Sequence, residues 1–555
     1  MGSLFIKIQS VVCSERESHY IFINMNKFKY QVIAFLAFVL IVQIQQLQAQ
    51  KKKNLLFIIT DQQQYKALSI AGNSVLKTPN LDRLAKSGAY FKNAYTPMAV
   101  CGPARSAILT GMTVENNGVN NNSKTYFYDK EPVMTTDTFD EILTKNGYHC
   151  EYYGKWHSMS THTDIYKNPL KKAKNGKSIF EHGGQSFVYK DYLNKHLPQR
   201  KLKEDELLDN FTKRPYKPNP LDSYYGKSYA EVIKTPKKRR AQPDFHGELQ
   251  IPAEHTITAY QAKEVIKAIN RSKDETFSIT LSIQMPHAPM TPSKPYFGMY
   301  PVSEMTPPAS INDPMENSPY VNANGRKKMP EYADKEKIKY MISNYYGIIT
   351  EIDDWVGKVL QTLEDNDLTD DTMIIFTSDH GEMLGAHGLR EKNDFYEESS
   401  HIPLMISFPK EIEKKTVVDN YVTNVDLFAT ILDYLEIPGE YKNDGTSLRD
   451  LIEGKTSDRE DYIVTEWDFR GPVSPNYMIV KDGWKLMVPY TVDSNVINAM
   501  YNLNEDPHEM TNLLGSNPDR AKYKEKAEEL RACLLEWLKK NNSKRYNGVR
   551  DRKLI

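Results

Sequence analysis

Short apolar segments alternate with segments of helical periodicity along this chain, and this alternation restricts the fold more than any other feature. Leu55–Thr60, Phe277–Ile283 and Met373–Ser378 consist largely of apolar residues, as expected of strands that are buried on both faces. Tyr345–Leu363 has apolar residues at intervals of three and four, which is typical of an amphipathic helix. The pattern predicts an α/β fold in which helices cover both faces of a large, mainly parallel sheet.

Each predicted strand is followed closely by residues that can bind ligands. These residues are Asp61 and Gln62 after the first strand, His287 after the second, and Asp379 and His380 after the third. In open α/β sheets, ligands bind outside the carboxyl ends of the strands. The sequence therefore predicts that three distant segments deliver polar side chains to one active-site edge.

The overall charge restricts the kinds of binding partner, and the number of cysteines restricts the disulfide crosslinks. Lys and Arg together number 72, as do Asp and Glu, so the overall charge does not favour nucleic acid or another polyanion. The chain has Cys101, Cys150 and Cys533 beyond its N-terminal region, too few for a disulfide framework in an exported protein of this size. We expect one of them to serve another purpose, and whether Cys150 and Cys533 pair is left open.

The N-terminal segment 25–49 has the pattern of a signal peptide. Lys27 and Lys29 precede an apolar run of 11 residues, Val32–Val42, and Ala49 supplies a small residue at the end. A buried helix is the alternative interpretation, but the run is too short for a membrane span, which needs about 20 apolar residues. We interpret residues 1–24 as an upstream extension, with the start at Met1 or Met25 undecided. We expect export to the periplasm or the medium, and no membrane span.

The mature chain is predicted to have two parts. Residues 50–437 form the catalytic domain, with an insertion around 160–250 that is rich in Lys, Tyr, Asn and Pro. Within it, the basic run Lys234–Arg240 either contacts an anionic polymer or, as is more common, forms solvated surface. Residues 438–555 form a smaller α+β domain, with short strands at Tyr477–Val480 and Trp484–Val488 and a final helix from Ala521 to Lys539.

The segment Cys101–Gly111 (CGPARSAILTG) is the most informative motif. Pro103 suits the first turn of a helix, and Gly111 suits its C-terminal end. Cys101 would then lie at a helix N-terminus, where free N–H groups favour negative charge. Taken alone, the motif is also compatible with an ordinary buried cysteine.

With its neighbouring motifs, the chain resembles the formylglycine-dependent (type I) sulfatases of the alkaline phosphatase superfamily, and bacterial polysaccharide sulfatases in particular. The signature Cys-x-Pro-x-Arg is matched by Cys101 to Arg105, and the resemblance runs from Asn54 through the C-terminal part. The further matching segments are NLLFIITDQ (54–62), TPNLDRLAKSG (78–88), GKWH (154–157), PHAP (286–289), TSDHGE (377–382), YEES (396–399) and YNLNEDPHEMTNL (501–513). This resemblance implies an alkaline phosphatase-like fold and hydrolysis of sulfate esters.

The resemblance also implies that a formylglycine-generating enzyme oxidises Cys101 to an aldehyde, 3-oxoalanine. The hydrated aldehyde has two hydroxyl groups: one attacks sulfur and expels the alcohol, and the second releases sulfate by losing its proton. A serine in this place would leave an ester that needs a separate hydrolysis.

The implied metal ligands are Asp61, Gln62, the modified Cys101, Asp379 and His380. Oxygen ligands in a flexible shell favour Ca²⁺ over Mg²⁺. Two positions depart from the usual pattern, because relatives usually have Asp where Gln62 stands and often Asn where His380 stands. The amide of Gln62 carries one negative charge fewer than an aspartate, which is expected to weaken metal binding.

The remaining matched residues are implied to hold a tetrahedral anion. Arg105 steadies the formylglycine, while Lys155 and Lys392 hold sulfate oxygens. His157 takes a proton as sulfate leaves, and His287 lies near the leaving oxygen, where a general acid would help. His387 is expected to contact residues of the site rather than the substrate or the metal. His401 stands where many relatives have Arg, and it is not assigned a role.

Sulfate-ester hydrolysis of a sulfated poly- or oligosaccharide is therefore the predicted function. A phosphodiester or phosphonate monoester hydrolase of the same fold is the alternative among enzymes. A non-catalytic exported carbohydrate-binding protein is the alternative outside enzymes, although Cys101, Arg105 and both Asp pairs are intact. The sequence does not identify the sugar, the sulfate position, endo or exo action, or the oligomeric state.

Overall fold

The computed structural model describes residues 53–122, 134, 136–158, 187–197, 216–217, 247–249, 251–288, 290–321, 330–456, 458–467 and 474–555. The upstream extension (1–24), the signal peptide (25–49), the basic run (234–240) and most of the insertion around 160–250 lie outside these residues. None of the described helices combines the length and the apolar character that crossing a bilayer requires.

The described residues contain a large sheet whose strands run mainly in one direction. Its order is β3 (His149–Gly154), β6 (Phe277–Pro286), β1 (Asn54–Asp61), β7 (Thr372–Ser378), β8 (Leu404–Ser407), β2 (Ala89–Tyr95) and β9 (Thr416–Thr423). Strand β8 is antiparallel to both its neighbours, and the other strand pairs are parallel. The prediction of a mainly parallel sheet is confirmed, and its three apolar segments are the adjacent strands β6, β1 and β7.

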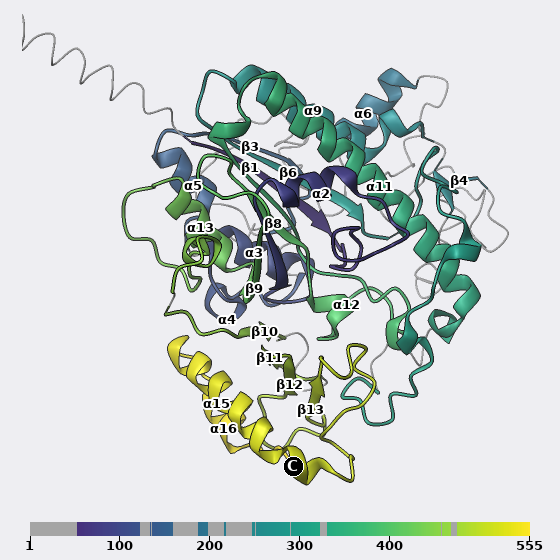
Figure 1. Ribbon diagram of the computed structural model, residues 1–555, viewed down its shortest axis with the longest axis vertical. Helices are drawn as coiled ribbons and strands as arrows, with labels where there is room; N and C mark the ends of the chain where they lie inside the picture. Colours follow the sequence, from purple (N-terminus) through teal and green to yellow (C-terminus); the bar gives the residue numbers. More distant parts are fainter. Residues whose placement is uncertain are drawn as a thin grey trace, which may run out of the picture. The chain divides into compact units, whose positions relative to one another are not determined.

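Helices cover both faces of this sheet (Figure 1). On β1, Leu56 and Ile58 face one core, whereas Leu55, Phe57 and Ile59 face the other. The first core is closed by α2 (Pro79–Lys86), α9 (Ile257–Ser272) and α11 (Lys335–Asp365), and the second by α3 (Cys101–Thr110), α5 (Phe139–Lys145) and α13 (Asp426–Tyr434). Because both faces of β1 are buried, an uninterrupted apolar sequence is required there.

Local sequence signals set the ends of two helices that matter for the site. The helix predicted at Tyr345–Leu363 is α11, which begins at Lys335 because the Asp334 carboxylate accepts the N–H groups of Glu336 and Lys337. Helix α3 ends at Gly111, whose φ of 64° is left-handed. A Cβ at Gly111 would lie 2.6 Å from Cβ of Phe428 on α13, so this position requires glycine.

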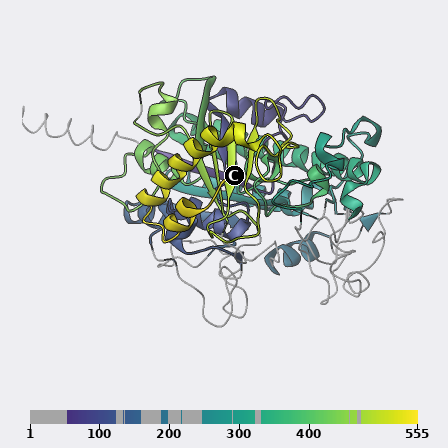
Figure 2. The same cartoon turned by 90° about the horizontal axis from the view of Figure 1, so that it is seen from below.

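The C-terminal part has an antiparallel sheet of its own, made by β10 (Ile463–Glu466), β11 (Tyr477–Lys481), β12 (Trp484–Val488) and β13 (Ala499–Asn502). Helices α15 (Lys524–Lys540) and α16 (Tyr546–Asp551) pack on one face, and Figure 2 has them in front. The other face packs against Tyr95, Phe395 and Tyr396. The predicted α+β character is confirmed, and the domain division at residue 438 stays a prediction. The final helix begins at Lys524, because 520–523 form a tighter 3-10 turn.

Shorter α-helices and strands lie between these elements. They are α4 (Val114–Asn117), α6 (Phe187–His196), β4 (Tyr216–Lys217), which pairs with β5 (Glu248–Leu249), α12 (Glu397–Ser400) and α14 (Arg449–Ile452). Among the described residues, Cys101, Cys150 and Cys533 form no disulfide with one another.

Candidate active site

Two adjacent strands bring the two predicted carboxylates together. Asp61 is the last residue of β1, and Asp379 directly follows β7, which pairs with β1 up to Thr60 and Ser378. The backbone N–H of Asp379 donates to the carbonyl of Thr60 at 3.2 Å, and that of Gln62 donates to Oδ1 of Asp379 at 3.1 Å. The parallel register thus places both aspartates at the predicted edge of the sheet.

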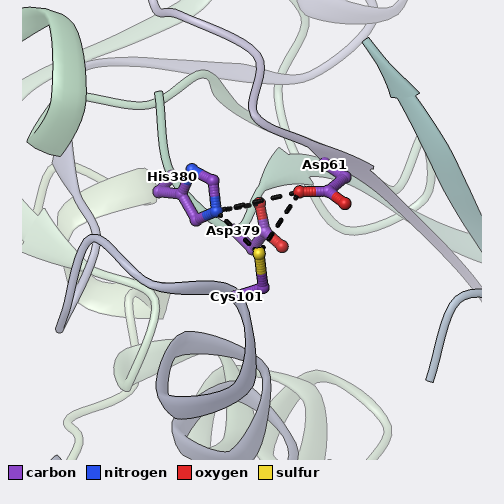
Figure 3. Close-up of side chains that lie close together, drawn as sticks. All are labelled: Asp61, Cys101, Asp379 and His380. Carbon is purple, nitrogen blue, oxygen red and sulfur yellow. Dashed lines mark hydrogen bonds and ion pairs between the residues drawn. The ribbon is translucent and has the colours of Figure 1, made fainter. Parts of the chain in front are cut away.

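Cys101 and His380 complete a buried group of four residues (Figure 3). Cys101 is the first residue of α3, and its Sγ lies 3.1 Å from Nε2 of His380 and 3.6 Å from Oδ1 of Asp61. Nε2 of His380 lies 3.5 Å from Oδ1 of Asp379 and 3.7 Å from Oδ1 of Asp61. One ligand atom from each residue lies within 4.8 Å of all the others, so this group could hold a metal ion.

The spacing of these donors fits a single bound metal ion. Calcium binds its ligands at about 2.3–2.6 Å, so ligand atoms around one ion lie up to about 5 Å apart. The group offers carboxylate oxygens of Asp61 and Asp379 and one imidazole nitrogen of His380. Sγ of Cys101 marks the position that an oxygen would take after conversion of this residue to formylglycine.

Arg105 is buried one helical turn after Cys101 and connects three parts of the site. Its Nε donates to Oδ2 of Asp379 at 2.8 Å. Its Nη1 donates to the carbonyl of Lys155 at 2.8 Å and to Oγ of Ser282 at 2.7 Å. The N–H groups of a guanidinium point in several fixed directions within one plane, so a single arginine can donate to all three acceptors. Arg105 therefore holds β3, β6 and the residue after β7 in place relative to α3.

Two lysines bring positive charge to the same place. Nζ of Lys155, just after β3, forms an ion pair with Oδ2 of Asp61. Nζ of Lys392 donates to Oε1 of Gln62. Both lysines are buried, and with Arg105 they place three cations around two carboxylates. The buried lysines beside the group of four could bind the oxygens of an anionic substrate.

These charges change the pKa values of the site residues. Burial favours the neutral form of Asp61, but Lys155, His287 and Arg105 outweigh it, so its pKa lies well below the ordinary value. Burial and Asp61 favour the thiol of Cys101, but Lys155 and Lys392 lead a larger opposing effect, and its pKa is lowered. Position 101 therefore favours a negative charge, as the helix N-terminus predicts.

The predicted site histidines differ in their surroundings. Nδ1 of His287, after β6, lies 3.0 Å from the carbonyl of Ala288. Burial, followed by the charge of Lys392, lowers the pKa of His287 well below its ordinary value. His157 follows β3 and is buried, with a φ of 44°. For His380, burial favours the neutral ring, but Asp379 and Cys101 raise its pKa.

The turn after β1 is held in an unusual conformation. Gln62 has a φ of 76°, which is uncommon for a residue with a side chain and costs about 1–3 kcal/mol. Tyr345 of α11 compensates, because its hydroxyl donates to the carbonyl of Gln62 at 2.8 Å and accepts the N–H of Gln64 at 2.9 Å. Backbone strain of this kind is typical of functional sites.

Sequence reasoning did not assign Glu382, which the structure places beside Gln62. Its carboxylate accepts a hydrogen bond from Nε2 of Gln62 and is 1% exposed. Only its position in the TSDHGE segment, three residues after Asp379, could have pointed to it. Ser282 of β6, which accepts from Arg105, was also missed, because a serine within a buried strand gives no signal.

His387 and His401 are built into neighbouring loops. Nδ1 of His387 lies 2.7 Å from Oδ2 of Asp313, and its ring stacks on Tyr396 with centroids 3.9 Å apart. The ring of His401 stacks on Tyr65 and Tyr95, with centroids 3.9 and 4.8 Å apart. Neither histidine belongs to the group of four metal-ligating residues.

Comparison with known families gives a match over most of the chain. The model of the sulfatase family matches residues 53–437, and a model described as N-sulphoglucosamine sulphohydrolase, C-terminal, matches residues 385–540. The chain is 28% identical to an arylsulfatase of Clostridium perfringens, with 88% of this chain and 94% of the relative covered. It is 27% identical to an N-acetylglucosamine-6-O-sulfatase of Bacteroides thetaiotaomicron, with 88% and 86% covered.

Solved structures share the fold. BT4656, solved in complex with its substrate D-glucosamine-2-N,6-O-disulfate, has a TM-score of 0.64 at 22% identity and covers 89% of this chain and 98% of its own. The phosphonate monoester hydrolase of Agrobacterium radiobacter has a TM-score of 0.69 at 22% identity, with 88% and 96% covered. The alkaline phosphatase-like fold is thereby confirmed. With its family model spanning residues 53–437, the chain belongs to the sulfatase family of sulfuric ester hydrolases.

Proposed function

We propose that this sulfatase removes sulfate from a sulfated poly- or oligosaccharide, using a formylglycine made from Cys101 and a bound Ca²⁺. The observation that carries the proposal is the position of Cys101, buried at the N-terminus of α3 beside Asp61, Asp379 and His380. The sulfated sugar is supported by relatives named as an N-acetylglucosamine-6-O-sulfatase and an ulvan-active sulfatase.

We assign the metal to Asp61, Gln62, Asp379 and His380, together with modified Cys101. When bound, Ca²⁺ supplies positive charge that favours ionisation of a hydroxyl group and withdraws charge from the sulfate. The modified residue supplies an oxygen nucleophile in place of sulfur. Carboxylate-rich surroundings favour Ca²⁺ over a softer metal, and Mg²⁺ fits less well because it demands a stricter octahedron.

The other residues of the site bind the substrate and move protons. Lys155 and Lys392 hold sulfate oxygens, and their ammonium groups offset the negative charge that gathers there in the transition state. Arg105 keeps Asp379 and the helix N-terminus in place. His157 accepts a proton as sulfate leaves. We assign the general-acid role to Nε2 of His287, because Nδ1 donates to the carbonyl of Ala288. This role requires the charged imidazolium, so the lowered pKa of His287 has to rise when the anionic substrate binds beside it.

We further propose that the protein is exported, with cleavage near Ala49, and that a formylglycine-generating enzyme modifies it. The apolar run Val32–Val42 supports export. A sulfatase that degrades polysaccharides acts on substrates too large to enter a cell, which agrees with a periplasmic or extracellular site.

Hydrolysis of phosphonate monoesters or phosphodiesters is the second candidate. The structural likeness to the phosphonate monoester hydrolases of Agrobacterium radiobacter and Silicibacter pomeroyi supports it, with TM-scores of 0.69 and 0.68. A further relative, 26% identical, is described as a multifunctional alkaline phosphatase superfamily protein of Trinickia caryophylli. Sulfuryl and phosphoryl groups have the same tetrahedral shape, so both could enter the site.

Kinetic comparison of the two ester classes tests the proposal. The mature, Ca²⁺-loaded enzyme is assayed with sulfated N-acetylglucosamines, sulfated algal oligosaccharides, a phosphonate monoester and a phosphodiester, and the Cys101→Ala variant serves as the blank. We expect the highest kcat/KM for a sulfated sugar and loss of activity after EDTA treatment. A higher kcat/KM for the phosphorus esters would support the second candidate. Binding of a sulfated polymer without release of sulfate would support the carbohydrate-binding alternative.

A further inference from the structure

The side-chain amide of Gln62 lies between two groups of opposite hydrogen-bonding character. Its Nε2 donates to Oε2 of Glu382, and its Oε1 accepts from Nζ of Lys392. A carboxylate can only accept and an ammonium can only donate. These two partners therefore leave one orientation of the Gln62 amide, in which the oxygen faces Lys392 and the NH₂ group faces Glu382.

Glu382 is itself fixed from the opposite side. Its Oε1 accepts the backbone N–H of Leu384 at 2.9 Å and that of Glu391 at 2.6 Å. Its other oxygen, Oε2, is left for Gln62. The carboxylate thus joins the turn after β1 to the two ends of the loop that leads to Lys392, and it is buried together with Gln62.

The amide oxygen of Gln62 lies on the side of Lys392, and the NH₂ group lies on the side of Glu382. Lys392, which the oxygen contacts, lies close enough to influence the charges of Asp61 and Cys101. An amide can place either an oxygen or an NH₂ group there, and only the oxygen binds a cation. An aspartate at position 62 would need no such orientation, because both of its oxygens are ligands.

We propose that Glu382 is a positioning residue for the metal site: it orients the amide of Gln62 so that the carbonyl oxygen faces the cation. Residues that hydrogen-bond to metal ligands typically change metal affinity about 10- to 100-fold when they are mutated. The inference rests on the proposed Ca²⁺ site. It explains how this chain can use an amide at position 62 as a metal ligand, where relatives usually have an aspartate.

Calcium titration of three variants tests this role by calorimetry on the mature, EDTA-stripped full-length protein. In Glu382→Gln, the new NH₂ group faces the NH₂ group of Gln62, so the Gln62 amide loses its acceptor and only Lys392 still orients it. We expect Ca²⁺ affinity to fall about 10- to 100-fold. In Gln62→Glu, the new charge favours Ca²⁺ but faces the carboxylate of Glu382, so we expect Ca²⁺ affinity below that of the double variant. In the double variant Gln62→Glu/Glu382→Gln, donor and acceptor are exchanged and the ligand keeps its charge, so we expect Ca²⁺ affinity at least equal to that of the wild type.

Glu466→Gln is the matched control. Glu466 is also buried and accepts two backbone N–H groups, those of Val114 and Glu115, but it is not among the four ligands. We expect wild-type Ca²⁺ affinity in this variant. Wild-type affinity in Glu382→Gln, or no recovery in the double variant, would overturn the role of Glu382. If Glu382→Gln unfolds without metal, the double variant decides alone.

The same titrations separate this inference from the proposed function. If Gln62→Ala weakens Ca²⁺ binding and Glu382→Gln does not, the ligand assignment stands and the positioning role is wrong. If the wild type binds no Ca²⁺, both the proposed metal and the role of Glu382 are wrong.

Discussion

At the scale of single residues, each of the three buried cations of the site has a buried acceptor. Arg105, Lys155 and Lys392 are engaged with Asp379, Asp61 and Gln62, respectively. Because each of these cations has a buried acceptor, removing one leaves an uncompensated polar group, which is costly in a site closed to water. We propose His157 and His287 for the proton transfers, because neither belongs to these three pairs.

The role of His287 as a general acid depends on the leaving group. A sugar alcohol is a poor leaving group that needs a proton, whereas a nitrophenolate leaves without one. We expect His287→Ala to lower kcat for a sulfated sugar about 10²- to 10⁴-fold and to change kcat for nitrophenyl sulfate far less. Steady-state kinetics with both substrates measure this, and equal losses on both would show that His287 has no acid role.

Many of the site residues could be predicted from the sequence, but the hydrogen bonds between them could not. The sequence predicts that Asp61, Asp379 and His380 converge because each follows a strand, whereas the resemblance to sulfatases places Cys101 with them. The structure brings these four residues together. Glu382 could not be found in this way. Its contact with Gln62 exists only because the chain after β7 folds back against the turn after β1.

At the scale of elements, β1, β6 and β7 could be predicted because each is a largely continuous run of apolar residues. Strands that are buried on both faces have such runs in place of alternating apolar and polar residues. The positions of the outer strands were not predictable. Strand β9 has an exposed Val417 and a mixed burial pattern, and β8 runs against its neighbours. Their pairing depends on contacts between distant parts of the chain.

Helix α4 leads to a prediction about the pH dependence of stability, because the side chain of Glu466, at the end of β10, accepts the first N–H groups of this helix. Burial raises the pKa of Glu466 to about 8, although the N–H groups of Val114 and Glu115 oppose the shift. The folded state therefore keeps a proton that the unfolded state loses above about pH 4.5. This contribution to stability is complete at low pH and is lost as the pH rises through about 8.

Glu466→Gln removes the titration and tests the sign. One pKa unit corresponds to about 1.4 kcal/mol, so we expect the wild type to lose a few kcal/mol more than the variant between about pH 5 and about pH 9. Urea denaturation of both proteins across this range measures the difference. A constant difference in the free energy of unfolding would contradict the raised pKa.

At the scale of the whole molecule, a buried ion network joins the small sheet to the segment that follows Lys392. Nζ of Lys485 on β12 lies 2.7 Å from Oε1 of Glu397 and 2.8 Å from Oε1 of Glu509. Glu397 also accepts from the hydroxyl of Tyr95 at the end of β2 and lies 2.9 Å from Nδ1 of His401. The C-terminal sheet is therefore tied to the catalytic part by charge as well as by apolar packing.

Removing Lys485 tests how strongly the two sheets are coupled. Lys485→Met leaves Glu397 and Glu509 buried without their cation, and we expect a loss of about 3–5 kcal/mol in the free energy of unfolding. Chemical denaturation measures the loss, and Lys481→Met is the control, because this side chain on the neighbouring strand β11 is 26% exposed. A loss no larger than that of the control would show that the network does not stabilise the contact.

The central claim is that Cys101 becomes the nucleophile of a sulfatase, and mass spectrometry of the peptide that contains Cys101 tests it most directly. The protein is produced with and without a formylglycine-generating enzyme. The account predicts a peptide lighter by about 18 Da than the cysteine form, only in the first sample, because the thiol is replaced by an aldehyde. An unmodified cysteine in the presence of an active maturation enzyme would contradict the claim.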